Sequence, residues 1–270
     1  MPFYIKLKLA LGLISGTALI VLAALLSANI SLLLPVCLIA ASACAAVYAT
    51  FVFYPKFDPT GTTVWKGPLG ERTLALTFDD GPSEHTASVL DALASRGVRA
   101  TFFFLSENAS KLPGLVDRAR SEGHAIGNHG SSHMKMHTMN AGQIEREIVG
   151  CEEVLGAISS GGGRKIMRVP HGFKSIALVR TARRLGYTLV GWTSGVWDSD
   201  RPGVKAIVQR SIEAVKPGCI LLLHDGDGVR PDADRSQTAE ALPRIIDYCL
   251  MHGYKFVTIP QILDMKRGVL

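Results

Sequence analysis

From Thr73 onward, short apolar runs alternate with amphipathic segments, and this alternation limits the fold more than any other feature of the chain. The apolar runs have the length of strands, and glycine closes several of the helical segments between them. We expect strands at 73–78, 99–105, 124–127, 165–169, 187–192, 219–223 and 255–258. We expect helices at 84–96, 115–122, 141–158, 176–185, 204–215 and 238–252, the third of them N-capped by Asn140. About seven β/α units in sequence predict an α/β fold with a parallel sheet that curls into a barrel.

The first 54 residues form a separate apolar region. Leu9 to Ala28 is uncharged for 20 residues, and a second uncharged stretch runs from Leu32 to Tyr54. Each is long enough to cross a bilayer as a helix. The first is longer than the apolar run of a signal peptide, about 7–15 residues. We therefore expect two transmembrane helices in a hairpin at 1–54, a Pro- and Gly-rich juxtamembrane linker at 55–72, and a globular domain at 73–270.

The charges beside these stretches predict their orientation. Lys6 and Lys8 precede the first stretch, Lys56 follows the second, and no charge lies between the two. Positive flanks favour the cytoplasm, so we expect a multi-pass inner-membrane protein whose globular domain faces the cytoplasm, with an extracytoplasmic domain as the alternative. The net charge is +6, and no Lys/Arg cluster with interleaved aromatic residues indicates nucleic acid. Five unpatterned cysteines do not form a disulfide framework.

Chemically active side chains fall at the ends of the expected strands, which meet at one rim in a parallel α/β fold. Asp79 and Asp80 follow the first strand, and successive side chains at a strand end point in different directions. One carboxylate can bind a cation while the other reaches a water on that cation. The alternative is an ordinary Asp-Gly-Pro turn.

The next candidates are histidines spaced four residues apart. His129 and His133 lie on one face if their loop is helical, near enough to share a metal. His137 continues the series, so a site of three histidines competes with one that includes Asp80. We favour Asp80, because one carboxylate and two imidazoles leave an open face for water and substrate. Such a set accepts zinc, cobalt, manganese or nickel, of which we expect zinc.

His224 ends the most apolar strand and can act as a general acid, with a buried, inert imidazole as the alternative. Arg168 and Asp198 are further candidates, or a plain ion pair.

Five motifs in order carry a family resemblance: they include Thr77–Pro82, Ala100–Phe103, Gly123–His129 and Leu222–Asp225. They resemble the polysaccharide deacetylase family (carbohydrate esterase family 4), which includes nodulation, chitin and peptidoglycan deacetylases. The resemblance implies a distorted (β/α) barrel with about seven strands.

The resemblance also implies roles for particular residues. Asp80, His129 and His133 would bind a divalent metal, and Asp79, paired with Arg168, would take the proton from the attacking water.

On the other side of the reacting bond, the resemblance implies that Asp198 orients His224, which protonates the departing amine. The backbone N–H of His171 would help to hold the oxyanion. Leu222 would line the pocket for the acyl methyl group, and Trp197 would belong to the sugar-binding wall.

Several positions depart from the family motifs. Gly130 stands where Ser or Thr is usual, so a loop-bracing hydrogen bond is missing or moved to Ser131. Gly195 and Ser199 replace an Asp and a Trp, and Trp197 comes one position early. None of these departures removes a metal ligand, the base or the acid.

The expected function is removal of an N-acetyl (N-acyl) group from an amino sugar in a polysaccharide, chitooligosaccharide, peptidoglycan or lipid-linked glycan. A domain facing the cytoplasm favours a lipid-linked sugar as partner, whereas one facing outward favours peptidoglycan. The alternatives are a catalytically silent carbohydrate-binding membrane protein and a deformylase or amidase acting on another acyl group.

Overall fold

The computed structural model describes residues 16, 30–54, 56–156 and 164–266, which belong to two compact units, Met1–Pro59 and Thr60–Leu270. In the first unit, helix α2 (Ile30–Phe53) contains a 19-residue segment, Pro35–Phe53, with a mean hydropathy of 2.2. It is the one helix in the described ranges that is long and apolar enough to cross a membrane. Apart from Gly16, the first expected span lies outside the described residues, so the two-helix hairpin remains a prediction.

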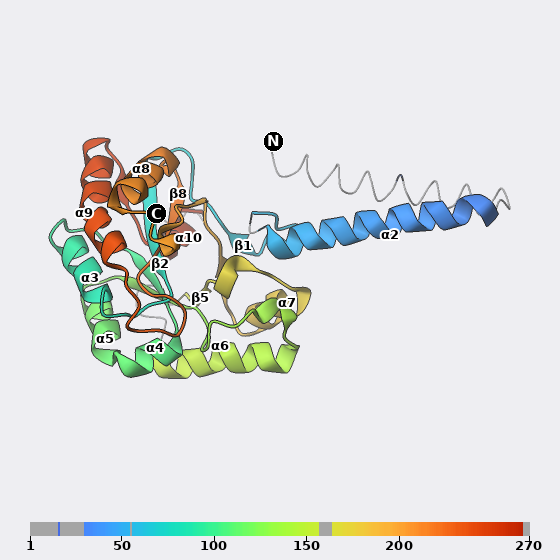
Figure 1. Ribbon diagram of the computed structural model, residues 1–270, viewed down its shortest axis with the longest axis horizontal. Helices are drawn as coiled ribbons and strands as arrows, with labels where there is room; N and C mark the ends of the chain where they lie inside the picture. Colours follow the sequence, from blue (N-terminus) through green and yellow to red (C-terminus); the bar gives the residue numbers. More distant parts are fainter. Residues whose placement is uncertain (1–15, 17–29, 55, 157–163, 267–270) are drawn as a thin grey trace. The chain divides into compact units, whose positions relative to one another are not determined.

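The second unit is built on a parallel sheet, and its helices lie round the outside of the strands (Figure 1). The strand order is β1-β6-β5-β4-β3-β2-β8-β7, with β9 also paired to β2. Every pairing is parallel. The strands are β1 (Thr63–Val64), β2 (Thr73–Asp79), β3 (Thr101–Phe104), β4 (Ala125–Asn128), β5 (Ile166–Met167), β6 (Thr188–Val190), β7 (Ser194–Gly195), β8 (Cys219–His224) and β9 (Lys255–Phe256).

The sheet curls round on itself, because β6 and β7 lie near opposite ends of the strand order yet only three residues separate them in the chain. Within this short connection, Gly191 N–H donates to the carbonyl of Val64 and Thr193 N–H to that of Ile220, each at 2.8 Å. The Thr193 hydroxyl donates to the carbonyl of Trp65 at 2.9 Å. One connection thus bonds to the edge strand β1 and to β8, the neighbour of the edge strand β7, and the parallel sheet fits the expected distorted barrel.

All seven expected strands are present, most of them shortened, and β1 and β7 are additional. These two strands have two residues each, too few to produce a periodic pattern. The six expected helices are also present, whereas α4 and α10 were not expected. The helices of this unit are α3 (Thr86–Ala94), α4 (Ser106–Lys111), α5 (Pro113–Ser121), α6 (Ala141–Leu155), α7 (Ile176–Arg184), α8 (Val204–Ala214), α9 (Ser236–Met251) and α10 (Ile259–Lys266).

Asn140 caps α6 as expected, and it does so through a reciprocal capping box with Gln143. The Asn140 side chain accepts from Gln143 N–H at 3.0 Å, and the Gln143 side chain accepts from Asn140 N–H at 2.9 Å.

The central strand β2 places the candidate site. All seven of its residues are buried, and Ala75 belongs to an apolar cluster with Phe103 and Ile220 from the neighbouring strands. Alternation along the strand puts Asp79 on the same face as Ala75. The carboxylate therefore lies at the end of the barrel interior, directly above the apolar core.

Candidate active site

Asp80 and two histidines form a compact group just beyond the end of β2. Asp80 Oδ1 lies 3.1 Å from His129 Nε2 and 3.0 Å from His133 Nε2, and the three candidate ligand atoms are within 4.8 Å of one another. Burial raises the pKa of Asp80, but the adjacent imidazoles of His129 and His133, together with the charges of His129 and His224, outweigh burial and hold that pKa well below its usual range.

The hydrogen-bond pattern of this group fits a bound cation. His129 Nδ1 lies 2.8 Å from the carbonyl of Arg168, which can only accept, so Nδ1 carries a proton and, in the neutral ring, Nε2 presents a lone pair. That lone pair faces Asp80 Oδ1, a buried oxygen with no hydrogen-bond donor among the described residues. Acceptors that converge in this way repel one another unless a cation lies between them. The donor set of one carboxylate and two imidazoles suits a catalytic divalent metal.

His129 and His133 lie close together, as their spacing predicts, but a helical loop is not what brings them together. The loop from His129 to His133 is not helical, because Gly130 (φ 85°) and His133 (φ 56°) both adopt the left-handed region. His137 is not part of the metal-compatible group, and its ring packs edge-on against Phe173 at a centroid distance of 5.1 Å. The structure therefore favours Asp80 over His137 as the third member.

Asp79 has a different partner from its neighbour. Its Oδ1 accepts from Arg168 Nη1 at 2.8 Å, while its Oδ2 lies 3.9 Å from His129 Nε2, on the side of the metal-compatible group. Arg168 is fully buried and also donates to Thr77 Oγ1 at 2.7 Å and to the carbonyl of Gly191 at 2.9 Å. Burial lowers the pKa of Arg168, and the charge of Asp79 opposes that shift.

His224 and Asp198 form a second pair, so the alternative of an ion pair between Arg168 and Asp198 is wrong. His224 Nδ1 lies 2.9 Å from Asp198 Oδ1, and Asp198 Oδ2 accepts from His224 N–H at 2.8 Å and from the Thr238 hydroxyl at 2.9 Å. Burial lowers the pKa of His224, but the charge of Asp198 and a hydrogen bond to it, together with the charges of Asp80 and Asp79, raise that pKa to about 9.

The three residues expected to contact substrate lie on strand β8 and on two loops. Leu222 is buried in β8 opposite Gly195 of β7, and a Cβ at Gly195 would lie 3.6 Å from Leu222 Cδ2. His171 is exposed, has a φ of 60°, and contacts the ring of His133 at a centroid distance of 4.5 Å. Trp197 is 68% exposed and has a φ of 57°.

No sequence pattern indicates the residues that hold Asp80 in place. Asn108 Nδ2 donates to the carbonyls of Asp80 at 2.8 Å and Gly228 at 2.7 Å, and Gly228 N–H donates to Asp80 Oδ2 at 3.1 Å. Asp80 has a φ of 72°, which residues other than glycine adopt rarely. Asn108 lies on the short polar helix α4, which has no periodic pattern to draw attention to it.

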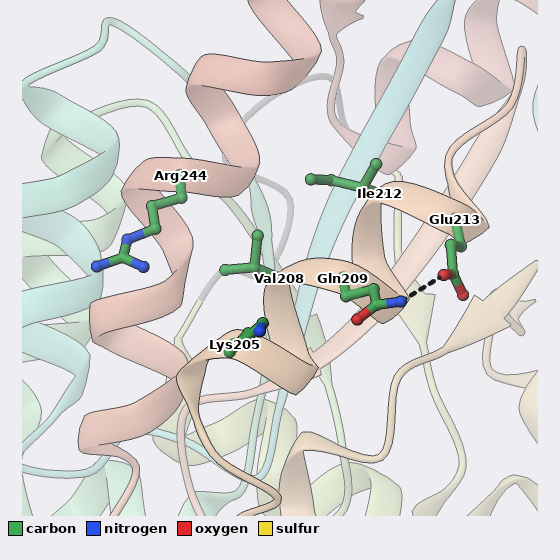
Figure 2. Close-up of a pocket in the computed structure, with 6 residues that line it drawn as sticks. All are labelled: Lys205, Val208, Gln209, Ile212, Glu213 and Arg244. Atoms are coloured by element: carbon green, nitrogen blue, oxygen red, sulfur yellow. Dashed lines mark hydrogen bonds between the residues drawn. The ribbon is translucent and has the colours of Figure 1, made fainter.

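A surface pocket between α8 and α9 is separate from this group (Figure 2). None of the expected site residues lines it, and within it the Gln209 side chain donates to Glu213 Oε1 at 3.0 Å. Its lining consists of Lys205, Val208, Gln209, Ile212, Glu213 and Arg244.

Comparison with known proteins agrees with the resemblance read from the motifs. Residues 66–190 match the family model described as polysaccharide deacetylase. A peptidoglycan-N-acetylglucosamine deacetylase of Bacillus cereus is 35% identical over 217 residues, which are 78% of this chain and 97% of that protein. A chitooligosaccharide deacetylase of Sinorhizobium fredii is 33% identical over 205 residues, 74% of this chain and 95% of that protein. A crystal structure of a peptidoglycan N-acetylglucosamine deacetylase superposes with a TM-score of 0.69 and 31% identity, over 76% of this chain and 97% of that one.

Proposed function

The chain belongs to the polysaccharide deacetylase family, and we propose that it is a metal-dependent hydrolase that removes the N-acetyl group from an amino sugar of a glycan. The observation that carries this proposal is the convergence of Asp80, His129 and His133 on one point with the Asp79 carboxylate beside them. An amide is hydrolysed when a polarised carbonyl, a base and an acid meet in this way.

Asp80, His129 and His133 would hold the metal, which we propose to be zinc. When bound, such a metal acts as a Lewis acid and lowers the pKa of water from about 15.7 to about 7. The His129 tautomer is already set for ligation, because its Nδ1–H donates to the carbonyl of Arg168.

Asp79 is the proposed general base. Arg168 occupies its Oδ1, so Oδ2 faces the metal ligands and is the oxygen that would take the proton from the attacking water. The new bond joins the water oxygen to the acyl carbon. Arg168, buried and fixed by Thr77 and Gly191, holds the carboxylate in one orientation throughout.

His224 is the proposed general acid. Its Nδ1 is held by Asp198, so Nε2 is the nitrogen that would give a proton to the sugar nitrogen as the carbon–nitrogen bond breaks. The products are the free amine and acetic acid, which loses its proton to solvent to give acetate, and the proton taken by Asp79 balances the one that His224 gives up.

The substrate would be gripped by residues round this centre. We propose that the His171 N–H helps to stabilise the oxyanion and that Leu222, opposite Gly195, borders the acyl pocket. The exposed indole of Trp197 would pack against a sugar ring.

The substrate class follows from the relatives, two of which are named for peptidoglycan N-acetylglucosamine and for chitooligosaccharides. We propose a glycan that contains N-acetylglucosamine, acted on beside a membrane, because α2 is suited to be an anchor.

A cytoplasmic domain of a multi-pass protein would meet a lipid-linked amino sugar, and an extracytoplasmic one would meet peptidoglycan. A reporter that is active on only one side, fused after Leu270, separates the two arrangements.

The proposed function is tested by acetate release from N-acetylated chitooligosaccharides, peptidoglycan and a lipid-linked amino sugar. Wild-type protein should release acetate from at least one of them, and metal-stripped protein should not. His133→Ala should abolish the release, whereas the matched variant His137→Ala should keep it. Folded, zinc-loaded protein that releases acetate from none of these substrates would favour a silent carbohydrate-binding protein or a different acyl group.

A further inference from the structure

The two proposed histidine ligands are joined by a three-residue loop, Gly130-Ser131-Ser132, whose backbone is hydrogen-bonded from several sides. Gly130 N–H donates to Asn128 Oδ1 at 2.8 Å. The carbonyls of Gly130 and Ser131 accept from the backbone N–H groups of Ser106 and Glu107, in α4, at 3.2 and 3.4 Å. A loop keeps one conformation when its backbone groups are hydrogen-bonded. After the bonds just named, the N–H groups of Ser131 and Ser132 still need acceptors.

Glu147 of α6 satisfies both of them. Its Oε2 accepts from Ser131 N–H at 2.9 Å and from Ser132 N–H at 3.1 Å, and its Oε1 accepts from the Ser132 hydroxyl at 2.8 Å. The Ser131 hydroxyl also reaches the backbone carbonyl of Glu147 at 3.3 Å. Hydrogen bonds to a carboxylate are roughly twice as strong as those between neutral groups. One side chain from outside the loop therefore fixes two consecutive residues directly before His133.

A side chain at Gly130, the first residue of the loop, cannot supply these hydrogen bonds in place of Glu147. Gly130 has no side chain, and its φ of 85° is strained for any residue that has one. A Cβ at this position would also lie 2.5 Å from Cε of the buried Met136. The conformation that joins the two ligands thus excludes a bracing side chain at 130 and depends on a partner supplied by α6.

His133 needs this support because of its own backbone. Its φ of 56° is one that residues other than glycine rarely adopt, and such a conformation persists only where the surroundings hold it. The residue before it, Ser132, is bonded to Glu147 through both its N–H and its hydroxyl. Release of Ser132 would let the chain relax and move the His133 ring away from Asp80.

We propose that Glu147 is a positioning residue that sets the metal affinity of this site by holding His133 toward Asp80. This inference rests on the proposed function, since it takes Asp80, His129 and His133 as metal ligands. Glu147 touches neither the substrate nor the reacting atoms. It acts through the loop, and its effect is largest on the binding of the metal.

Glu147 can be replaced without removing the packing of α6. The helix is anchored by fully buried side chains, and Glu147 lies half-buried at the edge of the face that they form. The buried residues that anchor it are Ile144, Ile148, Cys151 and Leu155. A matched control is Glu153, an exposed acidic residue on the same helix.

The test measures zinc affinity of the full chain by competition with a chromophoric chelator, for wild type, Glu147→Ala, Glu147→Gln and Glu153→Ala. We expect Glu147→Ala to weaken zinc binding by roughly 10- to 100-fold, the range seen when support of a ligand is lost. Glu147→Gln, which keeps one acceptor oxygen, should have a smaller effect, and Glu153→Ala should bind as wild type does. The thermal unfolding midpoint of metal-free protein should be similar in wild type and the Gln variant, since the loss concerns the metal site.

A folded Glu147→Ala protein with wild-type zinc affinity would overturn the inference and leave the proposed function intact. If Glu147→Ala does not fold, Glu147→Gln decides by the same criterion: undiminished affinity overturns the inference. A wild-type protein that binds no zinc, cobalt, manganese or nickel would overturn the proposed function as well.

In the cobalt-loaded protein, we expect Glu147→Ala to change the visible absorption, because a nitrogen ligand is lost or displaced.

Discussion

Asp79 and Asp80 are chemically identical neighbours, and the structure separates them by their partners. Asp79 is bonded to a guanidinium, whereas Asp80 faces two imidazoles without a hydrogen-bond donor on Oδ1 among the described residues. The turn of the backbone between them, with Asp80 at a φ of 72°, sends the two side chains in different directions. One residue type can therefore perform two tasks in adjacent positions.

Because of this division, Asp79→Asn should remove activity and keep the metal. The amide cannot take a proton from water, so we expect kcat/KM to fall by roughly 10²- to 10⁴-fold, the range of general acid–base catalysis. Zinc content, measured by elemental analysis, should remain that of wild type, whereas Asp80→Asn should lose zinc. An Asp79→Asn variant with near wild-type turnover would exclude Asp79 as the general base.

The raised pKa of His224 gives a prediction for pH. A general acid must be protonated, so the rate should fall as the pH rises through the pKa of His224, which is raised to about 9. Asp198→Asn removes the largest of the charges that raise this pKa and leaves the burial that lowers it. The alkaline limb of the profile of kcat against pH should therefore move down by roughly 1–3 pH units. An alkaline limb at an unchanged pH would show that His224 is not the group that titrates.

The same pair also contributes to stability, with a definite sign. The pKa of His224 is about 9 in the fold and 6.5 ordinarily, so its protonated form is favoured by folding. This contribution is fully present below pH about 6.5 and is lost as the pH rises through about 9. Asp198→Asn should therefore destabilise the protein more at pH 6 than at pH 10, as measured by urea unfolding.

At the scale of elements, the sequence predicts those that are long or strongly apolar. Strand β8 is a continuous apolar run and helix α6 has a clear helical period, and glycine or a capping box marks their limits. Strands β1 and β7 have two residues each, and α4 has six, so no window of sequence carries their signal. The metal-compatible residues were identified from their spacing and types, because each follows directly from a strand or a motif.

The supporting residues could not be found in this way. Asn108 and Glu147 act on residues that are distant in sequence, Asp80 and Gly228 for the first and the loop before His133 for the second. Their roles depend on how α4 and α6 pack beside the barrel rim, and polar residues on a helix give no sign of that. The sequence also left open whether the loop from His129 to His133 is helical, since a four-residue spacing does not reveal left-handed backbone angles.

Helix α4 provides a prediction at this scale. Asn108→Ala removes both donors that hold the carbonyls of Asp80 and Gly228, leaving two acceptors without their partner. We expect a loss of about 1–3 kcal/mol in the free energy of unfolding, the cost of an unsatisfied buried group, and weaker zinc binding. Urea unfolding of metal-free protein measures the first effect. Glu107→Ala, an exposed position on the same helix, is the control and should change neither quantity.

At the scale of the whole molecule, the chain combines a complete candidate site with an apolar segment outside it. The unit Thr60–Leu270 contains the entire barrel and every candidate catalytic residue. The unit Met1–Pro59 contributes α2, whose apolar segment is only 11% buried. An apolar helix exposed in this way is unfavourable in water, because its side chains lose the gain from burial. It is suited either to a membrane or to removal during export.

The two roles of α2, membrane anchor and signal sequence, predict different locations and N-termini for the mature protein in the cell. As an anchor, α2 should keep the full chain in the membrane fraction through an alkaline carbonate wash, whereas a chain that starts at Thr60 should be found in the soluble fraction with unchanged zinc affinity. As a signal sequence, it should be absent from the mature protein, which N-terminal sequencing would reveal. Retention of the chain lacking α2 in the washed membrane fraction would contradict both, since the remaining unit has no other described helix able to span a bilayer. Mutation of Ala43 and Cys44, at the middle of the apolar segment Pro35–Phe53, to Lys should release an anchored chain, because a charge at the centre of a spanning helix costs about 2.5–3.5 kcal/mol.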